Sequence, residues 1–278
     1  MTIAISIRVG EGLVYAADST STMFTTINEV SVLSQSYHHA QKLMQIGEFP
    51  VGVLTFGLGL IGTRNLESLL TEFNSQVLPD VPMPGGYTVA GIAAGLQAFL
   101  GDRYDGVFPP PEPALPDVAP PPDARPVMGV VVGGYSHGSF APEEFVLTLP
   151  LRDLEDTNPG TLGARWWGQT ASLQRLVLGF DQEVMTWLGE QGVEQEALHN
   201  IHRDFVQRFR WQISFDGMPL QDAVDLAVFL TNVAIGHSRF AIGPPVCGGH
   251  VDVATISHRG FRWIRRKELR VKSDSAFF

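Results

Sequence analysis

The chain has 278 residues, 44% of them hydrophobic, which is enough to bury a sizeable core. Its net charge of -10 and pI near 5.2 argue against a nucleic-acid partner, because a phosphate-binding surface needs a basic stripe. One cysteine excludes an internal disulfide and suits a reducing compartment. Because we find neither a signal-peptide pattern nor an apolar run of about eighteen residues, we expect a cytoplasmic protein that does not span a membrane.

The chain begins with a strand-like alternation over residues 2–9, followed by a turn at 10–12 and a second apolar run that ends at Asp18. Two short apolar runs joined by a glycine-containing turn predict an antiparallel hairpin, which returns Asp18 to the neighbourhood of Thr2. If Met1 is removed, the free α-amine of Thr2 can take the proton from the hydroxyl group of the same residue. Thr2 is therefore a candidate nucleophile, with an ordinary first strand as the alternative reading.

Two further strands are predicted over 42–46 and 51–56. The first begins at Lys42, and the second is followed by Gly57 and Gly59. The spacing of the apolar residues next predicts helices over 61–76 and 88–104.

A proline-rich segment over 108–126 contains nine prolines and shows neither helical nor strand periodicity. It is predicted to be a surface loop rather than a linker between domains. The pattern then predicts more strands and helices. The strands are expected over 127–132, 145–149, 250–257 and 261–264, and the helices over 171–191, 194–215 and 219–238.

The opening run resembles that of a proteasome β-subunit, in the threonine-protease branch of the N-terminal-nucleophile (Ntn) hydrolases, and is similar to the bacterial HslV and Anbu groups. Residues 128–135 and 248–256 resemble later strands of the same family, so that about three-quarters of the chain follows the family order. The resemblance implies an α+β fold, a four-layer αββα sandwich of two antiparallel sheets flanked by helices. It also implies a single domain over 1–278, with an extra helix near 194–215.

The resemblance assigns four catalytic roles by position: nucleophile, acid, lysine and oxyanion donor, carried by Thr2, Asp18, Lys42 and Gly57. A free α-amine has a pKa of about 7.7–8, so it is largely available as a base at neutral pH when a nearby cation lowers its pKa. Lys42 would supply that cation, and Asp18 would keep it charged and oriented. The N–H group of Gly57 would bind the oxyanion, a contact worth roughly 3–4 kcal/mol in comparable sites. The plainer alternatives are a solvated strand end for Lys42 and a turn residue for Asp18.

The chain departs from the family around this centre. Relatives surround the threonine with a serine-containing turn and an Asp-x-x-Ser before the Gly-Gly pair, whereas here Gln169 or Thr170 must substitute in the first region. Residues 244–247 read Pro-Pro-Val-Cys, with no acid and no serine. Three functions therefore stay open: a threonine peptidase or amidase acting on a peptide or protein, a non-catalytic ring or scaffold subunit, and an Ntn amidase acting on a small molecule.

The family places the first specificity pocket near the lysine and just before the oxyanion glycine, which here suggests Ala40, Met44 and Thr55. These side chains are small or apolar, so the resemblance predicts an apolar side chain before the scissile bond. Glycines such as Gly59 allow a substrate backbone to approach closely.

Two other site classes are disfavoured. Residues 57–62 match the glycine pattern of a dinucleotide-binding turn, but no strand ending in an acid follows about twenty residues later. His199 and His202 share a predicted helix without a suitably spaced carboxylate pair, so no metal site is expected. The His38–His39 pair is expected to face solvent or another subunit, and no cofactor is expected.

An exposed N-terminal nucleophile would cleave indiscriminately, and relatives enclose theirs in rings or helical stacks. Apolar faces around Leu198, Phe209 and residues 226–233 could supply the contacts. We therefore expect a homo-oligomer of at least six subunits with Thr2 facing an internal space and the proline-rich loop lying outside or at an entrance. The sequence does not identify an ATPase partner.

Overall fold

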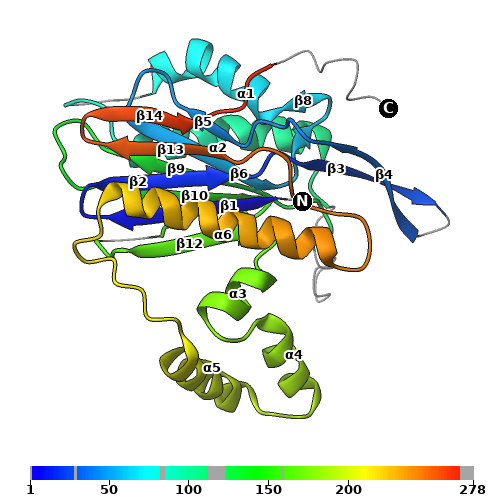
Figure 1. The fold of residues 1–278 in the computed structure, drawn as a ribbon. Helices are drawn as coiled ribbons and strands as arrows, with labels where there is room; N and C mark the ends of the chain where they lie inside the picture. Colours follow the sequence, from blue (N-terminus) through cyan, green and yellow to red (C-terminus); the bar gives the residue numbers. More distant parts are fainter. Residues whose placement is uncertain (1, 28–29, 82–84, 112–122, 158–159, 270–278) are drawn as a thin grey trace, which may run out of the picture.

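A computed structural model describes residues 2–27, 30–81, 85–111, 123–157 and 160–269. Two five-stranded antiparallel sheets are stacked in the middle of the molecule, with helices on both outer faces (Figure 1). Most of the proline-rich segment 108–126 lies outside the described residues. This arrangement confirms the prediction of an α+β fold with four layers.

The first sheet contains the N-terminal hairpin and has the strand order β12-β1-β2-β13-β14. Ile3 and Ala17 lie at the end of this hairpin where Asp18 follows, because β1 and β2 pair with Ala4 opposite Ala17. The strands are β1 (Ile3–Val9), β2 (Gly12–Ala17), β12 (Gly163–Gly168), β13 (Asp252–Ser257) and β14 (Gly260–Arg265).

The second sheet has the order β11-β10-β9-β6-β5 and faces the first across an apolar layer that includes Tyr15, Leu54 and Val131. Both long central strands of this sheet, β6 and β9, are buried over most of their length, which explains their nearly continuous valine and glycine runs. The strands are β5 (Leu43–Gln45), β6 (Val51–Gly57), β9 (Met128–Gly134), β10 (Glu143–Leu149) and β11 (Asp153–Asp156).

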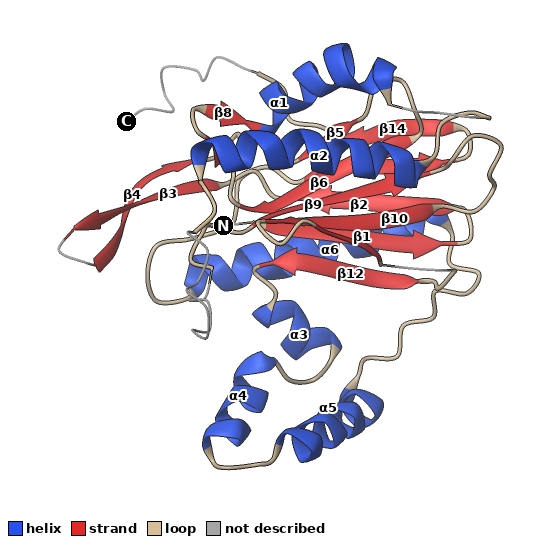
Figure 2. Ribbon diagram, turned by 180° about the vertical axis from the view of Figure 1, so that it is seen from behind, coloured by secondary structure: helices blue, strands red, loops and turns tan. Residues whose placement is uncertain are grey.

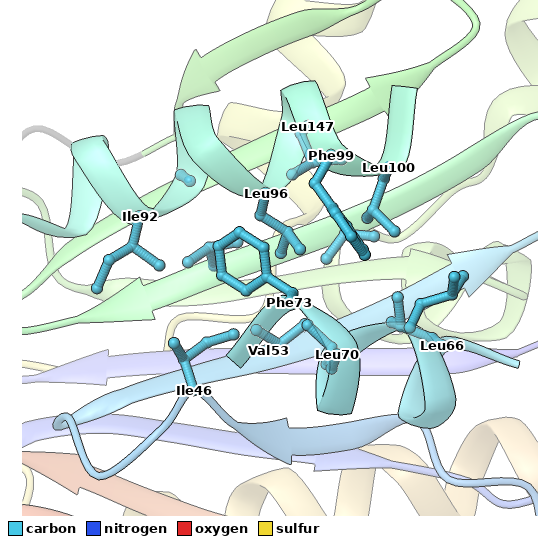
Figure 3. Packing of buried hydrophobic residues seen from close by; sticks show 14 of the residues in the cluster. Ile46, Val53, Leu66, Leu70, Phe73, Ile92, Leu96, Phe99, Leu100 and Leu147 are labelled. Atoms are coloured by element: carbon cyan, nitrogen blue, oxygen red, sulfur yellow. The ribbon is translucent and has the colours of Figure 1, made fainter. Parts of the chain in front are cut away.

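Helix α6 (Leu220–Phe240) covers the outer face of the first sheet, and α1 (Leu66–Glu72) and α2 (Val89–Val107) cover the second (Figure 2). A π-helical turn (Phe73–Val77) and a 3-10 turn (Leu78–Asp80) continue from α1. Figure 3 shows side chains from both helical segments packed on the second sheet, with the ring of Phe73 lying beside Leu96 and Phe99 of α2. Burying each such side chain contributes about 1.5–3 kcal/mol, so this layer holds β5 and β6 in place.

The helix expected over 61–76 begins only at Leu66. Gly62 adopts a φ of +62° in a tight turn between the two-residue strands β7 (Leu60–Ile61) and β8 (Arg64–Asn65). The side chain of Asn65 then caps α1 by accepting a hydrogen bond from the N–H of Ser68 (2.9 Å). The helix over 88–104 is confirmed, with Thr88 as its N-cap.

The helix expected over 171–191 is two helices, α3 (Ala171–Val177) and α4 (Gln182–Glu190), because Gly179 between them takes a φ of +86°. The helix expected over 194–215 forms as α5 (Gln195–Phe209), although it ends six residues before the predicted boundary. Helices α3, α4 and α5 form a lobe beside the sandwich (Figure 1).

A second hairpin lies between Asp18 and Lys42, where the sequence pattern predicts no strands. Strands β3 (Ser21–Ile27) and β4 (Val30–Tyr37) pair only with each other and project from the sandwich as an arm (Figures 1 and 2). Within the described part of the chain, no helix combines the length and the apolar character needed to cross a membrane.

Candidate active site

A cavity of about 360 Å³ opens between the base of the β3–β4 arm and the ends of β5 and β6. Six of the residues that the sequence marks as site residues line it: Thr2, Ala40, Lys42, Thr55, Gly57 and Gly59. Asp18 lies directly behind this wall and is completely buried. The fold therefore brings most of the predicted site together from segments up to 57 residues apart in the numbering.

The carboxylate of Asp18 is held by backbone donors from three segments. Its Oδ1 accepts a hydrogen bond from the N–H of Ile3 (3.0 Å), and its Oδ2 accepts from the N–H groups of Thr20 (3.1 Å) and Gly248 (2.9 Å). The hairpin register explains the first contact, since Asp18 follows β2 at the point where β1 begins. These donors fix the orientation of the carboxylate.

Lys42 donates from its ammonium group to Asp18 Oδ1 at 2.7 Å and to the carbonyl oxygen of Thr20 at 2.5 Å. Only 6% of its side chain is exposed. Burial lowers the pKa of Lys42 from its ordinary value, and the charge and hydrogen bond of Asp18 oppose that change. The lysine is thus a buried cation kept in place by one carboxylate.

Thr2 is fixed by its backbone on the same wall. It is 5% exposed, and its carbonyl oxygen accepts a hydrogen bond from the N–H of Gln169 (2.7 Å). Gly168 makes this approach possible, since it has a φ of +92° and an added Cβ would lie 1.9 Å from that oxygen. The start of β1 is therefore held between Asp18 on one side and the end of β12 on the other.

Gly57 ends β6 at the opposite wall of the cavity. Its φ is +77°, and an added Cβ would lie 2.4 Å from the carbonyl oxygen of Val127, so no other residue fits without movement of the backbone. Two residues earlier, the N–H of Thr55 donates to the carbonyl oxygen of Lys42 (3.0 Å). This bond ties β6 to the lysine.

Three of the sequence-predicted residues lie elsewhere. Met44 lines a separate hollow of about 220 Å³ together with Gln45, Trp263 and Arg266. The N–H group of Gln169 donates to the carbonyl oxygen of Thr2, as described above. Gln169 also lines another hollow beside α3. Thr170 immediately precedes α3 and is not among the residues that line the cavity.

His38 and His39 are site residues that sequence reasoning placed wrongly. Both are exposed, as expected, but they line the cavity rather than a remote surface. His38 Nδ1 lies 3.1 Å from the hydroxyl oxygen of Thr20, whose carbonyl group binds Lys42. Recognising β4 as a strand that returns to the sandwich would have located both histidines at the mouth of the site.

Cys247 occupies the position just before the Gly248–Gly249 turn. Its thiol is 2% exposed and lies 3.4 Å from the carbonyl oxygen of Ala234 in α6, facing away from the cavity. Burial and the nearby Asp18 charge raise its pKa to about 11. Cys247 therefore stays protonated near neutral pH and is not a competing nucleophile.

Among the described residues, no group of three or more histidine, cysteine or acidic side chains is arranged to hold a metal ion. What the site offers is a threonine, a buried lysine–aspartate pair and a glycine-lined wall.

Comparison with known proteins agrees with this architecture at the level of the fold. No family model matches the chain, and no curated protein matches it in sequence. A solved structure of the Gly-1 mutant of Anbu from Hyphomicrobium sp. strain MC1 superposes with a TM-score of 0.53 and 16% identity, over 99% of this chain and 90% of that chain. The similarity therefore spans nearly the whole molecule, and the chain has the fold of the Ntn hydrolases.

Proposed function

We propose that the chain is a proteasome-like threonine peptidase or amidase, folded as one domain over residues 1–278, in which Thr2 becomes the N-terminal residue and acts as the nucleophile. The observation that carries the proposal is the Asp18–Lys42 pair. A lysine ammonium group that is almost fully buried, 2.7 Å from a carboxylate, stands in the wall of the cavity that Thr2 also lines. An ion pair buried at a cavity is a costly arrangement for stability alone, so it favours a chemical role.

In the proposed reaction, the α-amine of Thr2 takes the proton from the Thr2 hydroxyl group as Oγ1 attacks the carbonyl carbon of the substrate. The resulting oxyanion is bound by the N–H group of Gly57. The amine then gives its proton to the leaving nitrogen, the C–N bond breaks, and an ester with Thr2 forms. Water, deprotonated by the same amine, attacks the ester and releases the acid. Lys42 lowers the pKa of the amine and stabilises the negative charge on Oγ1.

The cavity indicates the substrate side chain. Ala40 and Thr55 line it next to the proposed oxyanion donor, and Gly59 leaves room for the substrate backbone. The residues that line it include no aspartate, glutamate or arginine. We propose an apolar side chain before the scissile bond. A cleavage profile dominated by lysine, arginine or acidic residues would contradict this preference.

We also propose a homo-oligomer of at least six subunits that encloses Thr2. Phe209 at the end of α5 and Phe229 on α6 are 56% and 47% exposed, and α5 buries none of its residues. Apolar area of this kind usually marks a contact between chains.

A specific observation supports the second candidate, a non-catalytic ring or scaffold subunit. The side chains of Gln169 and Thr170 do not line the cavity, and Cys247 faces α6 where relatives place a serine. At these positions the chain therefore departs from the pattern of polar residues with which relatives surround their threonine. An Ntn amidase for a small molecule is the third candidate, and the cavity volume of about 360 Å³ suits it.

The deciding experiment combines intact-mass spectrometry with labelling by a threonine-directed epoxyketone or β-lactone. We expect mature protein that begins at Thr2 and is labelled once, and no label on Thr2→Ala. Ser21→Ala is the matched control, because Ser21 lines the same cavity without a proposed role. Met1 retained throughout would support the scaffold, and label that persists on Thr2→Ala would overturn the assignment.

A further inference from the structure

Strand β14 is the open edge of the first sheet and carries an unusual concentration of positive charge. It pairs only with β13 among the described residues. Residues 259–267 contain five of the 19 lysines and arginines of a chain whose net charge is -10, and they contain no acid. Arg259, Arg262 and Arg265 are exposed, and none of them forms an ion pair with a described residue. Exposed edges of this kind are templates for pairing with another strand.

Strand β11 is the open edge of the second sheet and has the opposite charge. Its four residues include Asp153, Glu155 and Asp156, all exposed. Asp153 and Glu155 form no ion pair with the described residues. The neighbouring Arg152 does not neutralise this edge, because its guanidinium group reaches over Gly101 to Asp105 on α2 (2.7 Å).

These two edges lie on opposite sides of the sandwich. In the second sheet β11 and β5 are the outer strands, and β5 packs against β2 and β13 of the first sheet, next to β14. In Figure 1, β14 is at the top of the first sheet and β12 at its bottom. A contact between a β14 edge and a β11 edge therefore joins two molecules and cannot form within one.

We propose that the β14 edge of one copy of this chain docks on the β11 edge of the next copy, so that Arg262 and Arg265 face Asp153 and Glu155. Two β14 edges would bring arginines together and two β11 edges would bring acids together, and like charges across a strand pair are destabilising. The charges thus reject a two-fold contact and favour a head-to-tail one. A head-to-tail contact repeats from copy to copy and generates a ring or a helical stack.

This proposal gives the homo-oligomer above a defined contact, and it does not depend on the chemistry of Thr2. The contact is electrostatic and exposed, so salt should weaken it. The assembly should lose mass as the ionic strength rises from about 0.05 M to about 1 M.

The experiment uses charge reversal and a readout of mass by light scattering or sedimentation. One variant combines Arg262→Glu with Arg265→Glu, and the other combines Asp153→Lys with Glu155→Lys. Each alone presents two edges of like charge and should fall to smaller species than the wild type. Mixed in equal amounts, they should regain the wild-type mass, since each then offers the edge that the other lacks. Arg239→Glu, at the exposed end of α6, is the control for a charge change elsewhere and should keep the wild-type mass.

A second experiment tests the contact between the β14 and β11 edges by disulfide cross-linking, a readout that does not rely on charge reversal. The one cysteine of the chain is buried, so Ile264→Cys with Glu155→Cys introduces exposed thiols on both edges. Under oxidation we expect a disulfide-linked ladder at multiples of 30.4 kDa. A monomeric wild type, reversed variants of unchanged mass, a mixture that does not reassemble, or the absence of a ladder would overturn the proposal. Activity that persists in those cases would leave the Thr2 assignment intact.

Discussion

Two buried carboxyl groups show how differently this sandwich treats an acid. Asp18 lies at the cavity and receives three backbone N–H groups together with the ammonium group of Lys42. Glu144 on β10 is 1% exposed between the two sheets and receives hydroxyl groups only. Its carboxyl oxygens accept hydrogen bonds from Ser6 (2.5 Å), Tyr15 (2.9 Å) and Thr157 (3.1 Å).

The two carboxyl groups have different surroundings. A cation and oriented N–H donors stabilise a carboxylate, whereas burial among hydroxyl groups penalises it. Burial accordingly raises the pKa of Glu144, although the three hydroxyl donors oppose that change. The chain thus surrounds the acid at the proposed active site with a cation and N–H donors, whereas the acid between the sheets is a polar cross-link held by hydroxyl groups.

Removing the Lys42 cation from beside Asp18 should have the largest effect on stability and activity. Lys42→Ala leaves Asp18 buried without its partner, which should cost about 3–5 kcal/mol of stability. We expect labelling and hydrolysis to fall by roughly 10²–10⁴-fold, because the cation that activates Thr2 is lost. Urea unfolding and single-turnover labelling would measure the two losses.

The chain contains a matched control for this variant. Lys267 forms a buried ion pair with Asp252 away from the cavity, and the exposed fractions of the two side chains are 7% and 1%. Lys267→Ala should destabilise the fold by a similar amount. Because the charge of Lys267 lowers the pKa of Lys42, its removal favours the charged form of Lys42, so the rate per folded molecule at neutral pH should not fall. Equal loss of activity in both variants would reduce the role of Lys42 to a structural one.

Neutralising the acid should have a smaller effect. Asp18→Asn removes the charge and keeps only one oxygen as an acceptor, so the pKa of Lys42 should fall further. The new NH2 group must face either the N–H groups of Thr20 and Gly248 or those of Ile3 and Lys42, so one pair of donors loses its acceptor. We expect a loss of activity on the order of tenfold, about 1.4 kcal/mol. A loss larger than that of Lys42→Ala would mean that Asp18 contacts the reacting atoms itself.

The dependence of activity on pH tests the Asp18–Lys42 pair without altering either side chain. Because burial lowers the pKa of Lys42 from the ordinary value of 10.5, the site should lose its cation at a lower pH than an exposed lysine would. Activity should therefore decline on the alkaline side below pH 10.5. Lys42→Arg should abolish that decline even if its overall rate is lower, since arginine stays charged. An alkaline limb that is identical in Lys42→Arg would assign the titration to another group.

The sequence could predict the features that depend on local patterns but not those that depend on contacts between distant segments. The hairpin that carries Thr2 to Asp18, the strand after Lys42 and the helix beginning at Val89 follow from local patterns, which the fold preserves. Glu144 gave no signal, because its partners Ser6, Tyr15 and Thr157 come from three distant segments. The place of His38 depends in the same way on a contact between segments, the pairing of β3 with β4. None of the side chains of these strands whose exposure is described is buried, so no buried apolar stripe marks them. Met44 lies in a separate hollow with Trp263 and Arg266, and this contact between distant segments is not contained in the local pattern.

The smallest expected effect concerns the second acid. Glu144→Gln keeps the shape of the side chain and cannot become charged. The pKa of Glu144 in the folded protein is raised above its ordinary value of 4.5, so its favourable contribution is fully present below pH 4.5 and is lost as the pH rises through the folded value. The wild type should therefore lose stability relative to Glu144→Gln as the pH rises above about 4.5.

Urea unfolding at several pH values gives the free energy of unfolding as a function of pH. The slope of this dependence should differ between the wild type and Glu144→Gln. Glu143→Gln is the control, since Glu143 is the next residue of β10 and pairs with Ser136 at a half-buried position. It should leave the slope unchanged. If Glu144→Gln also has the wild-type slope, then the hydroxyl donors stabilise the carboxylate as well as water does. The difference between the two acids would then lie in the cation of Lys42 alone and not in burial.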